Sequence, residues 1–159
     1  MPRGDENHDY SAALELELKD QNGVTRRLAD FRGHNLVVFF YPKDDTPGCT
    51  VEGKEFRDHF EEFRALDTHI IGVSTDPVDR HLAFATKHAF PYLLLSDEGG
   101  QLCEAFGVLR GTRAARSTFV FDTDLRVRRV FQEVTPRGHA AQVLSLIRAL
   151  VESHRMIGG

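Results

Sequence analysis

Cysteine is scarce in this chain of 159 residues, and the two that occur, Cys49 and Cys103, are far apart. Such a pattern excludes the disulfide framework of a small secreted domain. The first residues lack the apolar core of a secretory signal peptide, and no apolar run approaches the length that spans a bilayer. We therefore expect a protein of the reducing cytoplasm that does not enter a membrane.

An excess of positive charge is absent as well, because the formal net charge is -4. A chain with this charge has no overall attraction to nucleic acid. Residues 107–137 contain seven arginines and three acidic residues, but they carry no nucleic-acid-binding motif. We interpret this stretch as a solvated basic face and expect no nucleic-acid partner.

Histidines are present but scattered, and they do not form a metal-binding motif. Of the eight, only His81 and His88 have a spacing that brings two side chains to one face of a helix. Two ligands are too few for a metal site without help from elsewhere. We therefore interpret the histidines as surface residues and predict neither a metal site nor a cofactor.

The length and the hydrophobic patterning predict one α/β domain. We expect a flexible N-terminus at residues 1–9, followed by a single domain over residues 10–159. Central β-α-β units, closed by a hairpin and a terminal helix, favour a three-layer fold with a mixed sheet flanked by helices. The predicted strands are 14–18, 24–28, 36–41, 69–74, 91–96, 117–121 and 126–131, and the predicted helices are 47–66, 77–88, 101–106 and one after Gly138, with a loop at 107–116.

The passage from the strand at 36–41 to the following helix is the most informative stretch. Pro42 ends an apolar run, Thr46 has the character of an N-cap, and Pro47 suits the first helical position. Cys49 then falls in the first helical turn, where free backbone N–H groups and the helix dipole favour a thiolate over a thiol. Because the site lies at the carboxyl end of a parallel strand, we expect the chemistry there.

The helix that follows Cys49 carries an apolar stripe of Phe56, Phe60 and Phe63, which we assign to the core. Gly53 lies inside this helix and weakens it by about 1 kcal/mol relative to alanine. Its presence predicts either close packing at this point or a loosely held first turn.

These residues resemble a known family. The pattern Pro42-x-x-x-Thr46-x-x-Cys49 is similar to the active-site motif of the peroxiredoxins, and its surroundings resemble the peroxiredoxin Q (bacterioferritin comigratory protein) subfamily. The resemblance runs from about Leu14 to about Leu150. Further matching segments are Glu52, residues 55–58, Ser96-Asp97 and residues 116–119.

The resemblance implies a thioredoxin-like fold and a role for each matching residue. Cys49 is the peroxidatic cysteine, which attacks the peroxide O–O bond as a thiolate and becomes a sulfenic acid. Thr46 hydrogen-bonds the peroxide, and Pro42 shields the site from water. Arg116 favours the thiolate and stabilises charge on the departing oxygen, and Glu52 orients Arg116.

The resemblance also implies the reaction partners. They are a peroxide substrate, either hydrogen peroxide or an organic hydroperoxide, and a thiol reductant such as thioredoxin, glutaredoxin or glutathione. The expected oligomeric state is a monomer or a weak homodimer.

The sequence departs from the family pattern in its second cysteine and in one loop. In many members a resolving cysteine lies five residues after the peroxidatic one, where this chain has Lys54; others carry it near Ala85. We interpret Cys103 as a small buried residue and favour a one-cysteine mechanism. The alternative is that Cys103 resolves Cys49, within the chain or across a dimer. The stretch between Phe106 and Arg116 is also shorter than the resemblance leads us to expect.

Two other function classes stay open on this fold. A thiol–disulfide oxidoreductase needs a Cys-x-x-Cys pair, but Thr46 and Glu52 stand three residues before and after Cys49. A non-catalytic binding module of the same fold has no use for the set of Pro42, Thr46, Cys49 and Arg116. The sequence therefore predicts a thiol-dependent peroxidase that functions in antioxidant defence.

Overall fold

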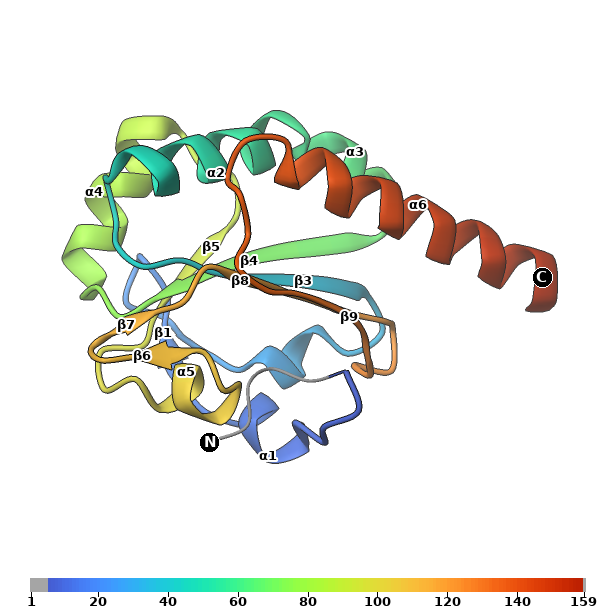
Figure 1. Ribbon diagram of the computed structural model, residues 1–159, viewed down its shortest axis with the longest axis horizontal. Coiled ribbons are helices and arrows are strands. Elements are labelled where there is room, and N and C mark those ends of the chain that lie inside the picture. Colours follow the sequence, from blue (N-terminus) through green and yellow to red (C-terminus); the bar gives the residue numbers. More distant parts are fainter. Residues whose placement is uncertain (1–5, 159) are drawn as a thin grey trace.

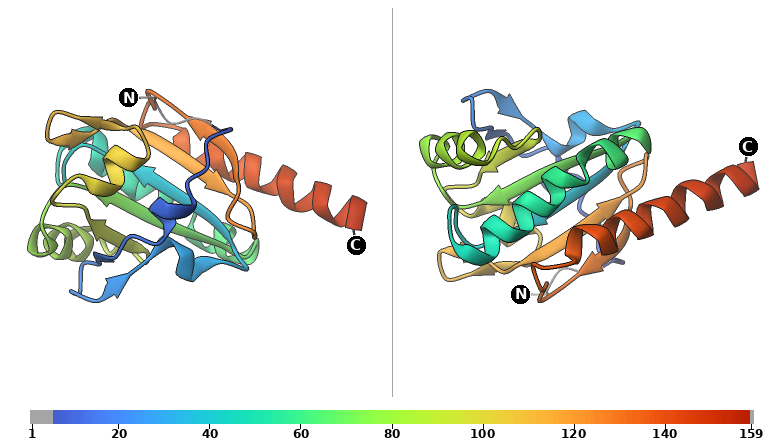
Figure 2. Two further views of the ribbon diagram at one scale, coloured as in Figure 1. Left: turned by 90° about the horizontal axis from the view of Figure 1, so that it is seen from below. Right: turned by 90° about the horizontal axis from the view of Figure 1, so that it is seen from above.

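The computed structural model describes residues 6–158. In this part of the chain, a seven-stranded sheet lies between two layers of helices (Figures 1 and 2). The sheet strands are β1 (Leu18–Lys19), β2 (Thr25–Arg26), β3 (Asn35–Phe40), β4 (Thr68–Ser74), β5 (Leu93–Ser96), β8 (Ser117–Phe121) and β9 (Val127–Phe131). The helices are α1 (Ser11–Leu14), η1 (Leu28–Phe31, a 3-10 helix), α2 (Pro47–Asp58), α3 (Phe60–Ala65), α4 (Val78–His88), α5 (Gln101–Ala105) and α6 (His139–Gly158).

The sheet is mixed, with the strand order β2-β1-β5-β4-β3-β8-β9. Strands β3, β4 and β5 are parallel, whereas β8 runs antiparallel to β3, and β9 antiparallel to β8. Phe40, the last residue of β3, pairs with Val73 of β4 and with Ser117 of β8. The start of β8 therefore lies at the same edge of the sheet as the loop that leads from β3 into α2.

The sheet separates two hydrophobic cores. The first, which we call the Cys49 core, joins Val37 and Phe39 of β3 to Cys49 and to apolar residues of α2, α3, α4 and α6. The second, the Cys103 core, joins Val38 and Phe40 to Cys103 and to residues of α1, η1 and α5. Successive side chains of a strand point to opposite faces, so the two cores lie on opposite sides of the sheet. The two views of Figure 2 show these two faces.

The structure confirms the mixed sheet, its two helical layers and most of the elements expected from the sequence. Phe56 and Phe63 are completely buried in the Cys49 core, and Phe60 is partly buried against it, as the apolar stripe predicted. The single domain over residues 10–159 stays a prediction.

The prediction is wrong at the first strand. Leu14 does not begin a strand; it ends α1, and β1 starts only at Leu18. The side chain of Asp9 accepts a hydrogen bond from the backbone N–H of Ser11, which favours a helical turn at this point. The second strand is likewise short, because Leu28 enters η1.

The N-terminal segment predicted to be flexible falls partly outside the described residues, namely at residues 1–5. Residues 6–9 are described, and the Glu6 carboxylate accepts a hydrogen bond from the backbone N–H of Val130 in the edge strand β9. No described helix combines the length and the apolar character needed to cross a membrane.

The helix predicted over 47–66 is interrupted at His59, which ends α2 and precedes α3. The backbone carbonyl of His59 accepts hydrogen bonds from the N–H groups of Glu62 and Phe63, so the chain turns and starts a new helix.

The stretch 107–116, predicted as a loop, contains a small separate hairpin of β6 (Leu109–Arg110) and β7 (Arg113–Ala114). The Thr75 hydroxyl at the end of β4 donates a hydrogen bond of 2.7 Å to the carbonyl of Thr112 in the hairpin turn. Gly111 has a φ of 63°, a conformation that glycine adopts without strain. The hairpin is thus fixed to the edge of the sheet where the parallel strands β3 and β4 end.

Gly53 is a site of close packing. A Cβ atom placed on it would lie 2.6 Å from Cζ of Phe90 and 3.2 Å from the hydroxyl of Tyr92. The same Tyr92 hydroxyl donates a hydrogen bond of 2.7 Å to the Gly53 carbonyl. The first turns of α2 are therefore held firmly against the segment before β5.

We predict that Gly53→Ala lowers the free energy of unfolding by about 1–3 kcal/mol, because overpacking outweighs the better helix propensity of alanine. Urea unfolding of the variant and the parent protein measures this change. Gly99→Ala is the matched control, since its nearest neighbour is 3.9 Å from the added Cβ. Equal stability of Gly53→Ala and the parent protein would contradict the close packing.

Candidate active site

The loop between β3 and α2 presents Cys49 at a helix N-terminus. Thr46 is the N-cap residue with φ -93° and ψ 156°, and Pro47 occupies the first helical position, as predicted. Cys49 is the third residue of α2 and only 2% exposed. Its sulfur therefore lies in the first turn, where backbone N–H groups without helical partners and the helix dipole favour negative charge.

The Thr46 side chain does not cap the helix. Its hydroxyl instead donates a hydrogen bond of 2.8 Å to the carbonyl of Lys43, within the loop. Only the backbone carbonyl of Thr46 joins the helix, by accepting from the N–H of Thr50. Pro42 opens this loop and is half-buried.

Arg116 connects the cysteine to a buried carboxylate. It precedes β8, and its Nη2 donates to Sγ of Cys49 at 3.4 Å, while its Nη1 donates to Oε1 of Glu52 at 2.7 Å. The Glu52 side chain is completely buried and that of Arg116 is 16% exposed. Gly48 gives the guanidinium room, because a Cβ there would lie 3.0 Å from Nη2. The structure thus brings Cys49, Glu52 and Arg116 together, although 64 residues separate the two members of the ion pair.

Burial has the largest single effect on the pKa values of Glu52 and Arg116. It raises the pKa of Glu52 to about 7, although the charge and the hydrogen bond of Arg116 act in the opposite direction. Burial alone would lower the pKa of Arg116, but Glu52 and Cys49 together hold it above its usual value. Among the described residues, Oε2 of Glu52 has no hydrogen-bonding partner. The carboxyl group is therefore poised to exchange a proton near neutral pH.

Cys103 does not join this group. It is completely buried in the Cys103 core, on the other side of the sheet, and both cysteines are free thiols. Burial, with the nearby Asp97 carboxylate, raises the pKa of the Cys103 thiol well above its usual range. The expectation of a small buried residue is confirmed.

The prediction of surface histidines is wrong for His81 and His139, which are 0% and 3% exposed. His81 lies on α4 behind the loop between β3 and α2, with Nδ1 2.6 Å from Oδ2 of Asp44. The spacing of His81 and His88 on one helix face was visible in the sequence. The buried partner of His81 was not predicted, because nothing in the sequence distinguishes Asp44 from an ordinary loop residue.

Asp44, Asp76 and His81 form the one described cluster whose spacing suits a metal ion, with ligand atoms within 4.8 Å of one another. All three are buried and hydrogen-bonded to protein groups. Hydrogen bonds within the cluster and from Ser74 and Tyr41 satisfy these groups without an ion.

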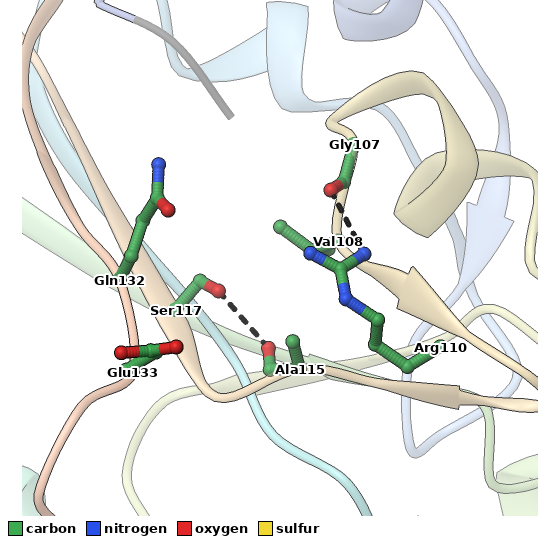
Figure 3. Close-up of a pocket in the computed structure, with 7 residues that line it drawn as sticks. All are labelled: Gly107, Val108, Arg110, Ala115, Ser117, Gln132 and Glu133. Atoms are coloured by element: carbon green, nitrogen blue, oxygen red, sulfur yellow. Dashed lines mark hydrogen bonds between the residues drawn. The ribbon is translucent and has the colours of Figure 1, made fainter. Parts of the chain in front are cut away.

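A small pocket lies beside the start of β8 (Figure 3). Its apolar wall includes Val108 and Ala115, which belong to or pack against the Cys103 core. The Ser117 hydroxyl in the pocket donates to the carbonyl of Ala115 at 3.1 Å. This pocket therefore opens on the face of the sheet away from Cys49.

Comparison with known proteins gives consistent matches. The AhpC/TSA family matches residues 11–130. Peroxiredoxin Bcp of Bacillus subtilis is 40% identical over 148 residues, which cover 88% of this chain and 94% of that protein. Chloroplastic peroxiredoxin Q of Populus jackii is 40% identical over 137 residues, covering 84% of this chain and 64% of that protein.

A solved structure of the bacterioferritin comigratory protein of Xanthomonas campestris is similar as well. It aligns with a TM-score of 0.86 at 36% identity, covering 89% of this chain and 95% of that one. This likeness confirms the thioredoxin-like fold that the sequence predicted.

The raised pKa of Glu52 predicts a pH-dependent stability. The group has a pKa of about 7 in the folded protein against an ordinary value of 4.5. Its protonated form therefore stabilises the fold below about pH 4.5, and this contribution is lost as the pH rises through about 7. This shift in the pKa of Glu52 corresponds to a change of at most about 3 kcal/mol in the free energy of unfolding.

The Glu52→Gln variant keeps an oxygen that accepts from Arg116, but its amide cannot ionise. The loss of stability with rising pH is therefore absent from this variant. Urea unfolding near pH 5 and near pH 8 measures the free energy of unfolding for both proteins. We expect the parent protein to lose more stability than Glu52→Gln between the two conditions. An identical pH dependence would contradict the raised pKa.

Proposed function

The chain belongs to the AhpC/TSA family and is a peroxiredoxin of the Bcp/peroxiredoxin Q type, and we propose that Cys49 is its peroxidatic cysteine. The observation that carries this proposal is the Arg116 guanidinium, which donates to Cys49 Sγ and to Glu52 at the N-terminus of α2. A positive group beside a sulfur in the first helical turn favours the thiolate, which is the nucleophile.

The proposed reaction has two stages. The Cys49 thiolate attacks one peroxide oxygen, so that an S–O bond forms while the O–O bond breaks and the second oxygen leaves as water or an alcohol after taking up a proton. Cys49 becomes a sulfenic acid. A thiol then condenses with it to a mixed disulfide and water, and a second thiol releases Cys49 as the reductant becomes a disulfide.

Each neighbour of Cys49 has a proposed role in the first stage. Arg116 stabilises the thiolate and then the negative charge on the departing oxygen, in a site from which water is largely excluded. Glu52 orients Arg116 by their charge-assisted hydrogen bond. The Thr46 hydroxyl donates its proton to the Lys43 carbonyl. Its oxygen then accepts a hydrogen bond from the peroxide. Pro42 shields the sulfur.

We favour a one-cysteine mechanism, in which an external thiol reduces Cys49. The location of Cys103 supports it, because the sheet separates the two cysteines and burial keeps the Cys103 thiol protonated. The close packing of Gly53 against Phe90 also opposes unwinding at the start of α2. In the alternative, Cys103 leaves its core and resolves Cys49.

Hydrogen peroxide and organic hydroperoxides are the proposed substrates. The study of the Xanthomonas campestris protein concerns its alkyl peroxide reduction activity, which supports the second class. Thioredoxin, glutaredoxin or glutathione is the proposed reductant, and the proposed state is a cytoplasmic monomer or weak homodimer. The two free thiols suit a reducing compartment.

We predict that Cys49→Ser abolishes peroxide consumption in the presence of a thiol reductant, whereas Cys103→Ala retains it. The measurement is the loss of hydrogen peroxide over time for both variants and the parent protein. Full activity of Cys49→Ser would overturn the proposed function.

Intact mass separates the two mechanisms. After one equivalent of hydrogen peroxide under non-reducing conditions, the one-cysteine mechanism predicts the gain of oxygen on Cys49. Loss of two hydrogens, with neither thiol left free, would mean a Cys49–Cys103 disulfide and would contradict the one-cysteine mechanism.

Arg116→Ala should slow the reaction of Cys49 with hydrogen peroxide by about 100-fold or more, because it removes the donor to the thiolate and to the departing oxygen. Stopped-flow kinetics of peroxide reduction measures the rate constant. Arg113→Ala is the control, since Arg113 is exposed on β7 and belongs to no part of the site. Equal rate constants for the two variants would exclude the proposed role of Arg116.

A further inference from the structure

A buried polar cluster lies behind the loop that carries Thr46. Its members are Asp44 of this loop, Ser74 and Asp76 at the end of β4, and His81 of α4, and none is more than 8% exposed. Buried charged groups are costly unless they are paired and hydrogen-bonded. Through Asp44, the cluster connects the loop that leads into α2 to the end of β4 and to α4.

The hydrogen bonds define where the protons of this cluster lie. Nε2 of His81 is 2.9 Å from the carbonyl of Leu95, and because a carbonyl only accepts, Nε2 carries a proton. On the other side of the ring, Nδ1 faces Oδ2 of Asp44 at 2.6 Å. The second Asp44 oxygen accepts from the Tyr41 hydroxyl at 2.6 Å. The hydrogen bonds with His81 and Tyr41 together fix the Asp44 side chain.

The cluster acts on the backbone through a single peptide group. The N–H of Asp44 donates to Oδ2 of Asp76 at 2.8 Å, and Oδ2 also accepts from the Ser74 hydroxyl. The carbonyl of the same peptide group belongs to Lys43, and it accepts the Thr46 hydroxyl proton at 2.8 Å. Because a peptide group is planar and rigid, fixing its N–H also fixes its carbonyl. The direction of the Thr46 O–H bond therefore depends on Asp44, Asp76 and His81.

We propose that Asp44, Asp76 and His81 are positioning residues for peroxide binding, which hold the peptide between Lys43 and Asp44 so that Thr46 donates to Lys43 and turns its lone pairs toward the substrate. The inference rests on the proposed function, in which Thr46 contacts the peroxide. With its proton engaged by Lys43, Thr46 only accepts, so it selects a protonated peroxide. The three residues touch no reacting atom and act through Thr46.

The experiment compares two reactions of the same cysteine. Thr46 takes part in the reaction with hydrogen peroxide, whereas alkylation of Cys49 by iodoacetamide needs no peroxide contact. Asp44→Ala should lower the rate constant for hydrogen peroxide by about tenfold or more, because the hydroxyl loses its orientation, and should change the alkylation rate by less than about twofold. A loss of both rates to the same extent would mean a general disturbance of the site and would overturn the proposal.

Asp44→Asn tests whether geometry or charge is needed. Its amide can donate to Nδ1 of neutral His81 while its oxygen still accepts from Tyr41, so every hydrogen bond is retained. We expect its peroxide rate constant to stay within about threefold of the parent value. Lys87→Ala is a second control, because it removes an exposed ion pair with Asp45 of the same loop and leaves the peptide group intact. A tenfold loss in Lys87→Ala would contradict the assignment.

A double-mutant cycle with Thr46→Val shows whether the cluster acts through Thr46. In the Thr46→Val background, Asp44→Ala should cause no further loss of the peroxide rate. Additive losses would overturn the proposal. If Asp44→Ala does not fold, His81→Gln replaces it, since glutamine reaches only one of the two His81 partners, and the same cycle applies. Failure of the proposed function itself is recognised separately, as retained peroxide reduction in Cys49→Ser.

Discussion

The pairing of β3 with both of its neighbours is the constraint on which the site depends. Phe40 lies opposite Val73 of β4 and opposite Ser117 of β8, so these three strands are aligned at one edge of the sheet. The loop that leads to Cys49, the segment that contains Asp76, and Arg116 all leave the sheet at this edge. A shift of one residue in the β8 register would turn Arg116 to the opposite face. The strand pairing thus brings the guanidinium to the sulfur.

The same sheet keeps the two cysteines apart. Cys49 lies where a helix N-terminus and a guanidinium favour the thiolate, whereas Cys103 lies in an apolar core beside the Asp97 carboxylate, which favours the thiol. The two sulfur atoms therefore lie in opposite electrostatic environments. In the proposed one-cysteine mechanism, a sulfenic acid on Cys49 is therefore reduced by a thiol from outside the Cys49 core.

The sequence predicted those elements that depend on interactions between residues close together in the chain. The apolar run of β3, the N-terminal signals of α2 and the stripe through Phe56 and Phe63 all correspond to observed elements. The buried cluster around His81 was missed because its partners come from three separate elements, and a polar residue gives no sequence signal of burial. The break at His59 and the turn at Asp9 were missed because each depends on individual backbone hydrogen bonds. The ion pair of Glu52 and Arg116 followed only from the family resemblance.

The charges around Arg116 explain why a carboxyl group with a pKa of about 7 belongs in this site. One guanidinium faces two acidic groups, Cys49 and Glu52, in a largely buried space. If both were ionised, the group would carry one uncompensated negative charge, which burial opposes. In the proposed mechanism, a proton on Glu52 leaves the Cys49 thiolate and Arg116 as a neutral pair. In the proposed reaction, the negative charge moves from the sulfur to the departing oxygen within reach of the same guanidinium, so the charges stay balanced without the movement of a charged side chain.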